Sequence, residues 1–199
     1  MSTTTPYPAE LAFHAEPRIT RWRPLVQWVL AVPHLIIARA LSALRGVLTL
    51  VSLFTVLFSE QIPRAIFDMI AMTYRYEWRA MSYALFLHED YPPFDFTPAA
   101  GDDGAEIHTT LSLSYPEGLN RWKPLYKWFL AIPHFLVAAV LSIGAMFAVL
   151  GGLIGVAISG QYPRGARDFI VGVYRYRLRA QAYAGLLTDQ YPPFTLAAR

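Results

Sequence analysis

The chain has 199 residues, of which 55% are hydrophobic and 15% aromatic, and its formal net charge is +3. So high an apolar content, with a positive mean hydropathy, is unusual for a soluble domain and indicates a membrane protein. Because the chain contains no cysteine, disulfides, thiolate metal sites and cysteine nucleophiles are excluded.

The first segments of the chain are polar. Residues 1–10 have neither a basic segment nor an apolar core, so we expect no cleaved signal peptide. Residues 11–15 alternate in polarity, as do residues 110–115, and this period of two predicts strands. We expect the two strands to pair outside the membrane.

The chain is an internal repeat. Residues 21–94 recur in 121–194, with 33 of 74 positions identical at an offset of 100. The identities gather at the two ends of each copy, while the middles, 39–58 and 139–158, stay apolar and share few residues. The predicted units are a first membrane repeat (7–95), a polar linker (96–106) and a second membrane repeat (107–199).

Each copy opens with an Arg-Trp-basic-Pro-Leu segment and a second tryptophan, which predicts a short helix at the membrane interface. Pro33 and Pro133 are expected to end or kink that helix. From Phe135 to Ile158 the chain then runs 24 residues without a charge. At about 1.5 Å per residue this stretch covers the roughly 30 Å hydrocarbon core of a bilayer, so it predicts a transmembrane helix.

The first copy of this helix, residues 35–58, contains two arginines. Arg39 lies near the start, from where its side chain can reach the headgroups. Arg45 lies deeper and requires a partner or a wet interior, because a charge near mid-bilayer costs on the order of 2.5–3.5 kcal/mol.

After a turn at residues 59–64, a last helix is predicted to run to Leu87, and its counterpart to Leu187. One face of each helix carries an aspartate, two arginines and a tyrosine, and both copies keep this set while neighbouring residues change. We interpret this stripe either as inter-repeat ion pairs or as a site for an anion or lipid headgroup. The stripe consists of Asp68, Arg75, Arg79, Tyr83, Asp168, Arg175, Arg179 and Tyr183.

Two placements of helices 65–87 and 165–187 remain open: they span the bilayer, which their apolar neighbours favour, or they lie in its interface. With spanning, the expected fold is an all-α integral membrane protein. It has tandem-repeat helical hairpins, four long helices plus short interfacial helices, and a small extramembrane β-strand pair. If each copy crosses twice, both copies start on the same face and form a parallel repeat.

The orientation is predicted from basic residues, six of which precede the spans while three lie at the turns. The positive-inside rule then predicts cytoplasmic termini of a multi-pass protein. Glycines at 151 and 155 and Ser159 give the second long helix a small-residue face that we expect to pack copy against copy or chain against chain. The basic residues are Arg18, Arg21, Arg23, Arg121, Lys123 and Lys127 before the spans, and Arg64, Arg164 and Arg167 at the turns.

No catalytic pattern is present in the sequence, and we expect no enzyme, no cofactor and no metal site. His34 and His134 recur in both copies but lie 100 residues apart without a carboxylate at ligand spacing, which favours packing or capping. Three further histidines, His14, His88 and His108, are not shared between the copies, so we interpret them as incidental.

The repeated motifs resemble a bacterial family, the domain of unknown function numbered 4389. They are Trp-basic-Pro-Leu…Trp…Ala-x-Pro-His, Gln-x-Pro-Arg…Asp, Tyr-Arg-Tyr…Arg-Ala…Tyr-Ala and Tyr-Pro-Pro-Phe, in this order and twice. The resemblance covers about 160 residues and implies a bacterial integral membrane protein with tandem copies. It implies no activity. The first copy departs from the family's Pro-Arg-Gly at Ala65 and adds Arg39 and Arg45.

The expected function is that of a scaffold or accessory subunit in the bacterial inner membrane. Its expected partners are membrane lipids, including anionic phospholipid, and a membrane protein or a second copy of itself. Nucleic acid is not expected, because no aromatic-basic motif supports it. The alternative is a small transporter or channel, with a polar path between the repeats past Arg45, Asp68 and Arg75.

Overall fold

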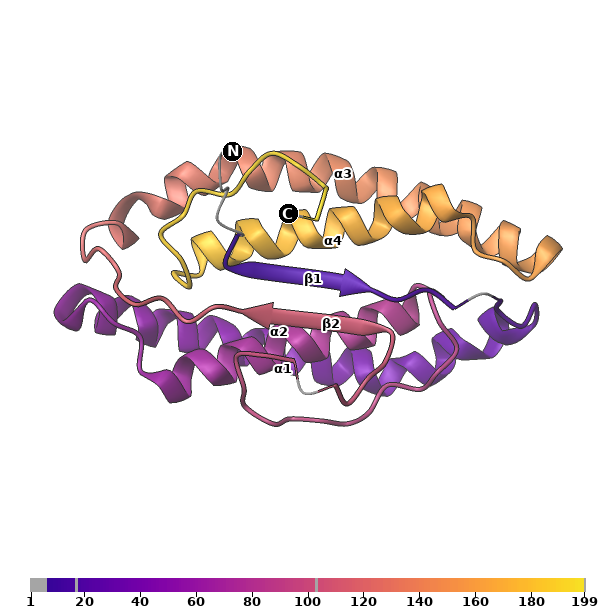
Figure 1. Ribbon diagram of the computed structural model, residues 1–199, viewed down its shortest axis with the longest axis horizontal. Coiled ribbons are helices and arrows are strands. Elements are labelled where there is room, and N and C mark those ends of the chain that lie inside the picture. The colour runs from indigo at the N-terminus through magenta and orange to yellow at the C-terminus, as the bar shows by residue number, and fades with distance from the viewer. Residues whose placement is uncertain (1–6, 17, 103, 199) are drawn as a thin grey trace, which may run out of the picture.

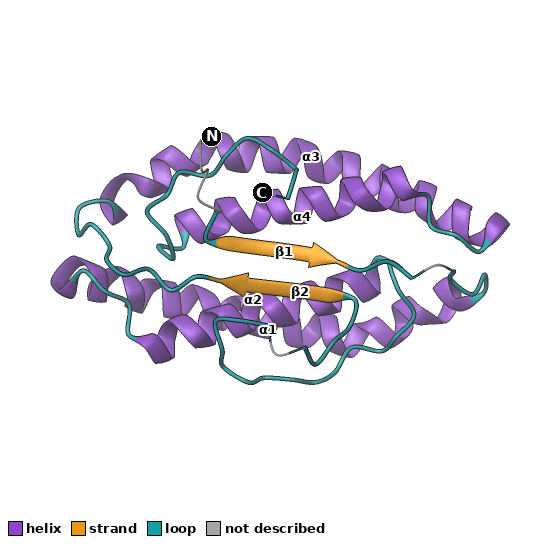
Figure 2. Ribbon diagram, viewed as in Figure 1, coloured by secondary structure: helices purple, strands orange, loops and turns teal. Residues whose placement is uncertain are grey.

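The computed structural model describes residues 7–16, 18–102 and 104–198. Its order is strand, helix, helix, and then the same again (Figure 1). The fold is mostly helical, with a small sheet (Figure 2). The elements are β1 (Ala9–Phe13), α1 (Arg23–Ser59), α2 (Arg64–Ala84), β2 (Thr109–Leu113), α3 (Pro124–Ser159) and α4 (Arg164–Ala184).

The two strands pair as predicted, two residues earlier than expected for β1. They run antiparallel, and the central pair of the register is Leu11 with Leu111. These two residues are also equivalent in the repeat, since 111 is 11 plus the offset of 100. A pseudo-twofold axis therefore passes through this pair, perpendicular to the sheet, and relates the two copies.

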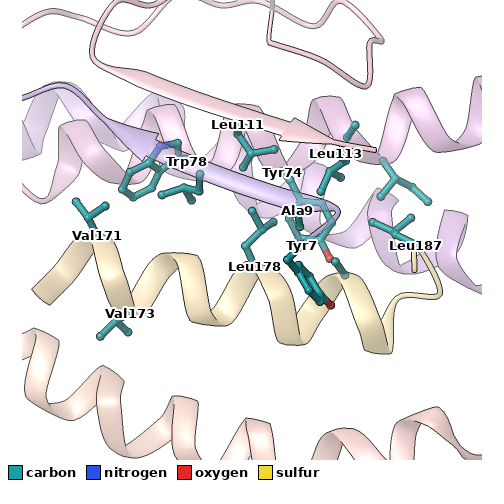
Figure 3. Packing of buried hydrophobic residues seen from close by; sticks show 14 of the residues in the cluster. Tyr7, Ala9, Tyr74, Trp78, Leu111, Leu113, Val171, Val173, Leu178 and Leu187 are labelled. Atoms are coloured by element: carbon teal, nitrogen blue, oxygen red, sulfur yellow. The ribbon is translucent and has the colours of Figure 1, made fainter. Parts of the chain in front are cut away.

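Each strand packs on the helices of the other copy. β1 contacts α4 and β2 contacts α2, while α1 packs on α2 and α3 on α4. Figure 3 shows Val171 and Leu178 of α4 projecting toward Trp78 of α2 and Leu111 of β2, within the main hydrophobic core. The core thus forms where the inner face of the sheet meets α2 and α4, and both copies contribute to it.

The predicted short interfacial helix is not a separate element. α1 and α3 are continuous helices of 37 and 36 residues, and Pro33 and Pro133 lie inside them. Pro33 lies on the exposed side of α1. A proline removes one helical hydrogen bond, and the turns on both sides of it continue the helix here.

The two copies run antiparallel, so the predicted arrangement, in which both copies start on one face and cross the membrane in the same direction, is wrong. The backbone N–H of Ile19 donates to the carbonyl of Gly160 at 2.8 Å, and that of Leu119 donates to Glu60 at 3.1 Å. The start of each long helix therefore lies beside the turn that ends the other. The count of six basic residues against three assumed that both starts share one face, so it no longer sets the orientation.

α1 and α3 have the polarity of an inside-out amphipathic helix. The buried face of α1 includes Gln27, His34, Arg45 and Ser52, whereas its outer face is apolar apart from Arg39 and the terminal Ser59. A helix on the surface of a soluble protein shows the reverse pattern. Such an outer face needs an apolar environment to cover it.

Among the described residues, α1 and α3 are the two helices long and apolar enough to cross a membrane, and only 17% of the most apolar window of each is buried. The expected set of four spans is therefore reduced to two candidates. α2 and α4, 21 residues each, are interior helices that carry the buried arginines of the stripe.

Candidate functional site

Arg75 of the stripe binds the polar connector between the copies. Its guanidinium donates to the carbonyls of Thr97 (2.7 Å), Ala99 (2.9 Å) and Gly101 (2.7 Å), and the residue is only 1% exposed. A planar group with five donors is well suited to gather several carbonyls at once. The linker is thus folded onto α2 and is not a free tether.

Arg79 binds the same connector through its acidic residues. It forms ion pairs with Asp95 (3.0 Å) and Asp102 (3.3 Å), and its side chain is 1% exposed. Asp102 also accepts the backbone N–H of Leu111 at 2.8 Å, which ties the connector to β2. Arg79 therefore has acidic partners, but these come from the connector and not from the stripe.

The arginines of the second copy hold the corresponding C-terminal segment. Arg175 donates to the carbonyls of Leu196 (2.7 Å) and, across the copies, Leu11 (3.1 Å). Arg179 donates to Thr195 at 3.4 Å and lies over the ring of Tyr7. Each arginine pair therefore fastens the tail of its own repeat.

The two aspartates of the stripe do not join the arginines beside them. Asp68 pairs with Arg64 one turn earlier at 3.1 Å, and Asp168 pairs with the adjacent Arg167 at 3.1 Å. Both lie in the first turns of α2 and α4, away from the buried arginines. The predicted meeting of these aspartates with arginines across the seam is therefore wrong, because local partners reach them first.

The two tyrosines of the stripe belong to an aromatic cluster that is built twice. Tyr83 packs edge-on against Tyr91 with centroids 5.6 Å apart, and Tyr183 against Tyr191 at 5.5 Å. Both stripe tyrosines are at most 3% exposed. Their role in the structure is packing against the Tyr-Pro-Pro-Phe segment of each copy.

The same cluster surrounds the repeated histidines. Nδ1 of His34 lies 2.8 Å from the hydroxyl of Tyr76, and the ring stacks on Phe94 at 4.3 Å. His134 has the equivalent partners at 2.8 Å and 4.1 Å. The Pro-His and Tyr-Pro-Pro-Phe motifs therefore meet in space, which fits the expected packing role.

Arg45, the buried arginine of α1, has the partner that its position requires. It forms an ion pair with Glu77 of α2 at 2.5 Å and stacks over the ring of Tyr74 at 4.0 Å. The second copy has Ala145 and Arg177 at the equivalent positions of Arg45 and Glu77. The charge pair is therefore specific to the first copy.

A second polar site was missed by sequence reasoning. His88 follows α2, His108 precedes β2, and their rings stack with centroids 4.7 Å apart. Nε2 of His108 lies 2.9 Å from Asp90 and 3.0 Å from Glu16, while Glu106 accepts the backbone N–H of His108 at 2.8 Å.

The electrostatics of the two rings differ. Burial, together with nearby His108, lowers the pKa of His88 to about 3, against a smaller opposing effect of Asp90. Burial alone would also lower the pKa of His108, but hydrogen bonds with Asp90 and the His14 carbonyl, and the charges of Glu16 and Glu106, raise it above its ordinary value. His88 is therefore neutral at pH 7.

No short spacing in the sequence could reveal this cluster. Its residues lie in three segments, around positions 16, 88–90 and 106–108, which only the packing of β1 beside β2 brings together. The one feature of the sequence that pointed to this cluster was the concentration, at the ends of the connector, of histidines and acidic residues that are not repeated in the other copy.

Comparison with known proteins gives one result. The family model described as "Domain of unknown function (DUF4389)" matches residues 21–95 and 121–195. No curated protein matched the chain. No solved structure matched it either. Both matched segments begin at the Arg-Trp start of a long helix and end just after Tyr-Pro-Pro-Phe, so they coincide with the two structural copies, and the chain belongs to the DUF4389 family as a tandem pair of its domains.

Proposed function

We propose that this protein is a membrane-embedded scaffold without a catalytic role. The observation that carries the proposal is the outward apolar face of α1 and α3, on which large side chains such as Leu25, Phe58, Phe129 and Ile158 are between 63% and 81% exposed. Faces of this size mark membrane or partner contacts. Their length, from one end of each helix to the other, favours lipid.

We further propose that the helices lie along the membrane and do not cross it. The pseudo-twofold axis is perpendicular to the sheet and relates α1 to α3, so both helices have the same depth if that axis is the membrane normal. If the helices crossed instead, the strands would lie at mid-depth. The outward side chains of β1 and β2, such as Glu10 and Ser112, would then face hydrocarbon, which is costly for a charged group.

The charges at the two ends of the molecule support contact with anionic lipid. The start of α1, with Arg18 and Arg21, lies beside the α3–α4 turn with its Arg164. The pseudo-symmetric end carries Arg121 and Arg64. Trp22 and Trp122, 58% and 65% exposed, accompany them, as interfacial tryptophans do. These ends, and not the stripe, are the proposed headgroup contacts, in the bacterial inner membrane that the family resemblance implies.

The contacts favour a scaffold over the alternative of a transporter. Arg45, Asp68 and Arg75, the residues of the expected polar path, have three separate sets of partners. The seam between α2 and α4 is closed by Trp78 and Tyr174, whose ring centroids are 5.1 Å apart.

Membrane binding itself is tested by flotation of the purified protein with vesicles. We expect it to float with vesicles that contain phosphatidylglycerol and to float less with neutral ones. The double variant Arg21→Glu/Arg121→Glu should reduce binding to the anionic vesicles alone. Failure of the wild-type protein to float with any vesicle overturns the proposal.

The placement is tested by single cysteines, since the chain has none of its own. Gln61→Cys and Gln161→Cys lie at exposed, equivalent turns at opposite ends of the molecule. If the helices lie along the membrane, an impermeant maleimide labels both, and Ser112→Cys as well, from one side. Labelling of the two turns from opposite sides, with Ser112→Cys protected, shows that the helices cross. Phe147→Cys on the apolar face is the protected control.

A further inference from the structure

The strongest unassigned chemistry is the cluster around His108, at the junction of three chain segments. His108 belongs to two groups of three potential metal ligands, one with His88 and Glu106 and one with Glu16 and Asp90. In each group the donor atoms lie within 4.8 Å of one another, and the first group is entirely buried. A group of this kind is a candidate site only if one of its donors lacks a protein partner.

His88 supplies that donor. The hydroxyl of Ser82 donates to the carbonyl of Arg79 at 2.9 Å, so it accepts a hydrogen bond from Nε2 of His88 at 3.0 Å. With the N–H of the ring at Nε2, Nδ1 has the lone pair. It is buried without a hydrogen-bond partner in the described part of the chain, and the residue is 0% exposed.

His108 is oriented in the way that metal-binding histidines are. Its Nδ1 lies 3.1 Å from the carbonyl of His14, the contact in which a ring N–H donates to the backbone and leaves Nε2 free as a ligand. Nε2 is the atom that faces Asp90 and Glu16. This nitrogen therefore lies between two carboxylates, and the same three groups can ligate an ion.

We propose that this cluster binds one divalent transition-metal ion of the class of Zn²⁺, with His108 as the central ligand. Two imidazoles and carboxylates are the donor set that suits Zn²⁺, whereas Ca²⁺ and Mg²⁺ prefer oxygen alone. Bonds of 2.0–2.2 Å require donors roughly 3.5 Å apart, so the side chains close by about an ångström on binding.

The site belongs to one side of the pseudo-symmetric molecule. Thr188 and Gln190 stand where the first copy has His88 and Asp90, and neither is a metal ligand of this class. The ion would join the end of β1, the end of α2 and the start of β2. It would therefore lock the connector, which Arg75 and Arg79 already hold at its other part, to the N-terminal strand.

The test is metal content of the full chain, purified without a histidine tag, stripped with chelator and dialysed against Zn²⁺. We expect about one Zn²⁺ per wild-type chain by mass spectrometry. We also expect a rise in Tm of roughly 5–10 °C at 100 times the Kd, because the ion binds the folded state. His88→Gln and His108→Gln should lose the ion, and His14→Gln, whose ring is outside both groups, should keep it.

Two results overturn the proposal: a wild-type chain that retains no Zn²⁺ and shows no change in Tm, or a folded His108→Gln that retains as much Zn²⁺ as the wild type. If the histidine variants fail to fold, the double variant Glu16→Gln/Asp90→Asn decides. Its changes lie at the edge of the cluster, where Asp90 is 62% exposed, and it should bind Zn²⁺ at least 10-fold more weakly. Unchanged affinity then counts against the site.

Discussion

At the scale of single residues, the buried arginines hold segments without regular secondary structure against α2 and α4. Arg75 and Arg79 are 1% exposed and donate to the connector, and Arg175 donates to the C-terminal segment. Loops have backbone carbonyls that no strand or helix satisfies, and a buried guanidinium supplies several donors at once. Each copy has such an irregular segment after its last helix, and this explains why both copies keep the arginines of the stripe.

Arg75→Gln should destabilise the protein by about 2–4 kcal/mol, because three carbonyls lose a charged donor. The loss should appear first as faster hydrogen exchange in residues 95–102, measured by mass spectrometry. Arg64→Gln is the matched control, since its 60% exposed ion pair with Asp68 contributes only about 0.5 kcal/mol. Equal exchange in the two variants would contradict the fastening role.

Asp189 provides a pH-dependent contribution to stability. Burial alone would raise its pKa, but hydrogen bonds from Lys127 (2.6 Å) and the N–H of Asn120, with the charges of Lys127 and Lys123, hold the pKa below its ordinary value. A depressed folded pKa gives stability that is present above about pH 4 and is lost as the pH falls through the folded value.

Asp189→Asn should therefore cost about 2–3 kcal/mol at pH 7, because Lys127, 1% exposed, loses its counter-charge. The difference from wild type should shrink as the pH falls below 4, measured by thermal unfolding in detergent. Glu89→Gln, at the equivalent position of the first copy, where the neutral Gln27 replaces Lys127, should change little at either pH. A difference that does not depend on pH would exclude the ion pair as its source.

At the scale of elements, the small residues of α3 pack within their own hairpin. A side chain at Gly152 would meet the ring of Tyr162 at 2.0–2.4 Å, whereas Gly151 has nothing within 4 Å. Of the predicted face, Gly155 packs in the same way, because a side chain there would meet the ring of Pro163 in the same hairpin at 2.6–2.7 Å, so the expected contact between copies or between chains is wrong for Gly155. The first copy has Ser52 in place of Gly152 and Ile62 in place of Tyr162, and both are fully buried. The larger residue on the helix is thus paired with a smaller side chain from the turn.

Gly152→Ala should lower the free energy of unfolding by about 1–3 kcal/mol through overpacking. Gly151→Ala should be neutral or stabilise by up to about 1 kcal/mol, as alanine does in an open helical position. The double variant Gly152→Ser/Tyr162→Ile, which copies the first repeat, should recover most of the loss. Thermal unfolding of the wild type, Gly152→Ser, Tyr162→Ile and this double variant measures the coupling, and additive effects would contradict it.

At the scale of the whole molecule, the exchange of strands makes the copies interdependent. β1 belongs to the first repeat in sequence but packs on α4, and β2 packs on α2. The predicted boundaries, 7–95 and 107–199, therefore describe repeats of the sequence. In the structure, the core of each repeat is completed by a strand from the other. The connector is part of the folded structure.

Residues 1–95 and 96–199 produced separately should each fail to fold, because each half lacks the strand that covers its inner helix. Produced together, they should associate, and the pair should show cooperative thermal unfolding near that of the intact chain. Circular dichroism and co-purification measure this. A stable, monomeric half would show that the exchanged strand is dispensable.

Much of the fold could be predicted from the sequence. The repeat, the strand pair, the turns and the apolar stretches depend on local patterns and on comparison of the chain with itself. The long helices could not be bounded, because Pro33 and Pro133 predict an end that the surrounding apolar turns override. The stripe was recognised, but its partners were not, since they lie in loops.

The sequence by itself determined that this protein is two related helical units with outward apolar surface, and which residues both units share. The tertiary structure alone decided how the units are related. The antiparallel pairing through Leu11 and Leu111 reverses one copy, because strand register is a long-range choice that local patterns do not contain. That reversal brings His88 and His108 together, and it makes α1 and α3 equivalent about one axis.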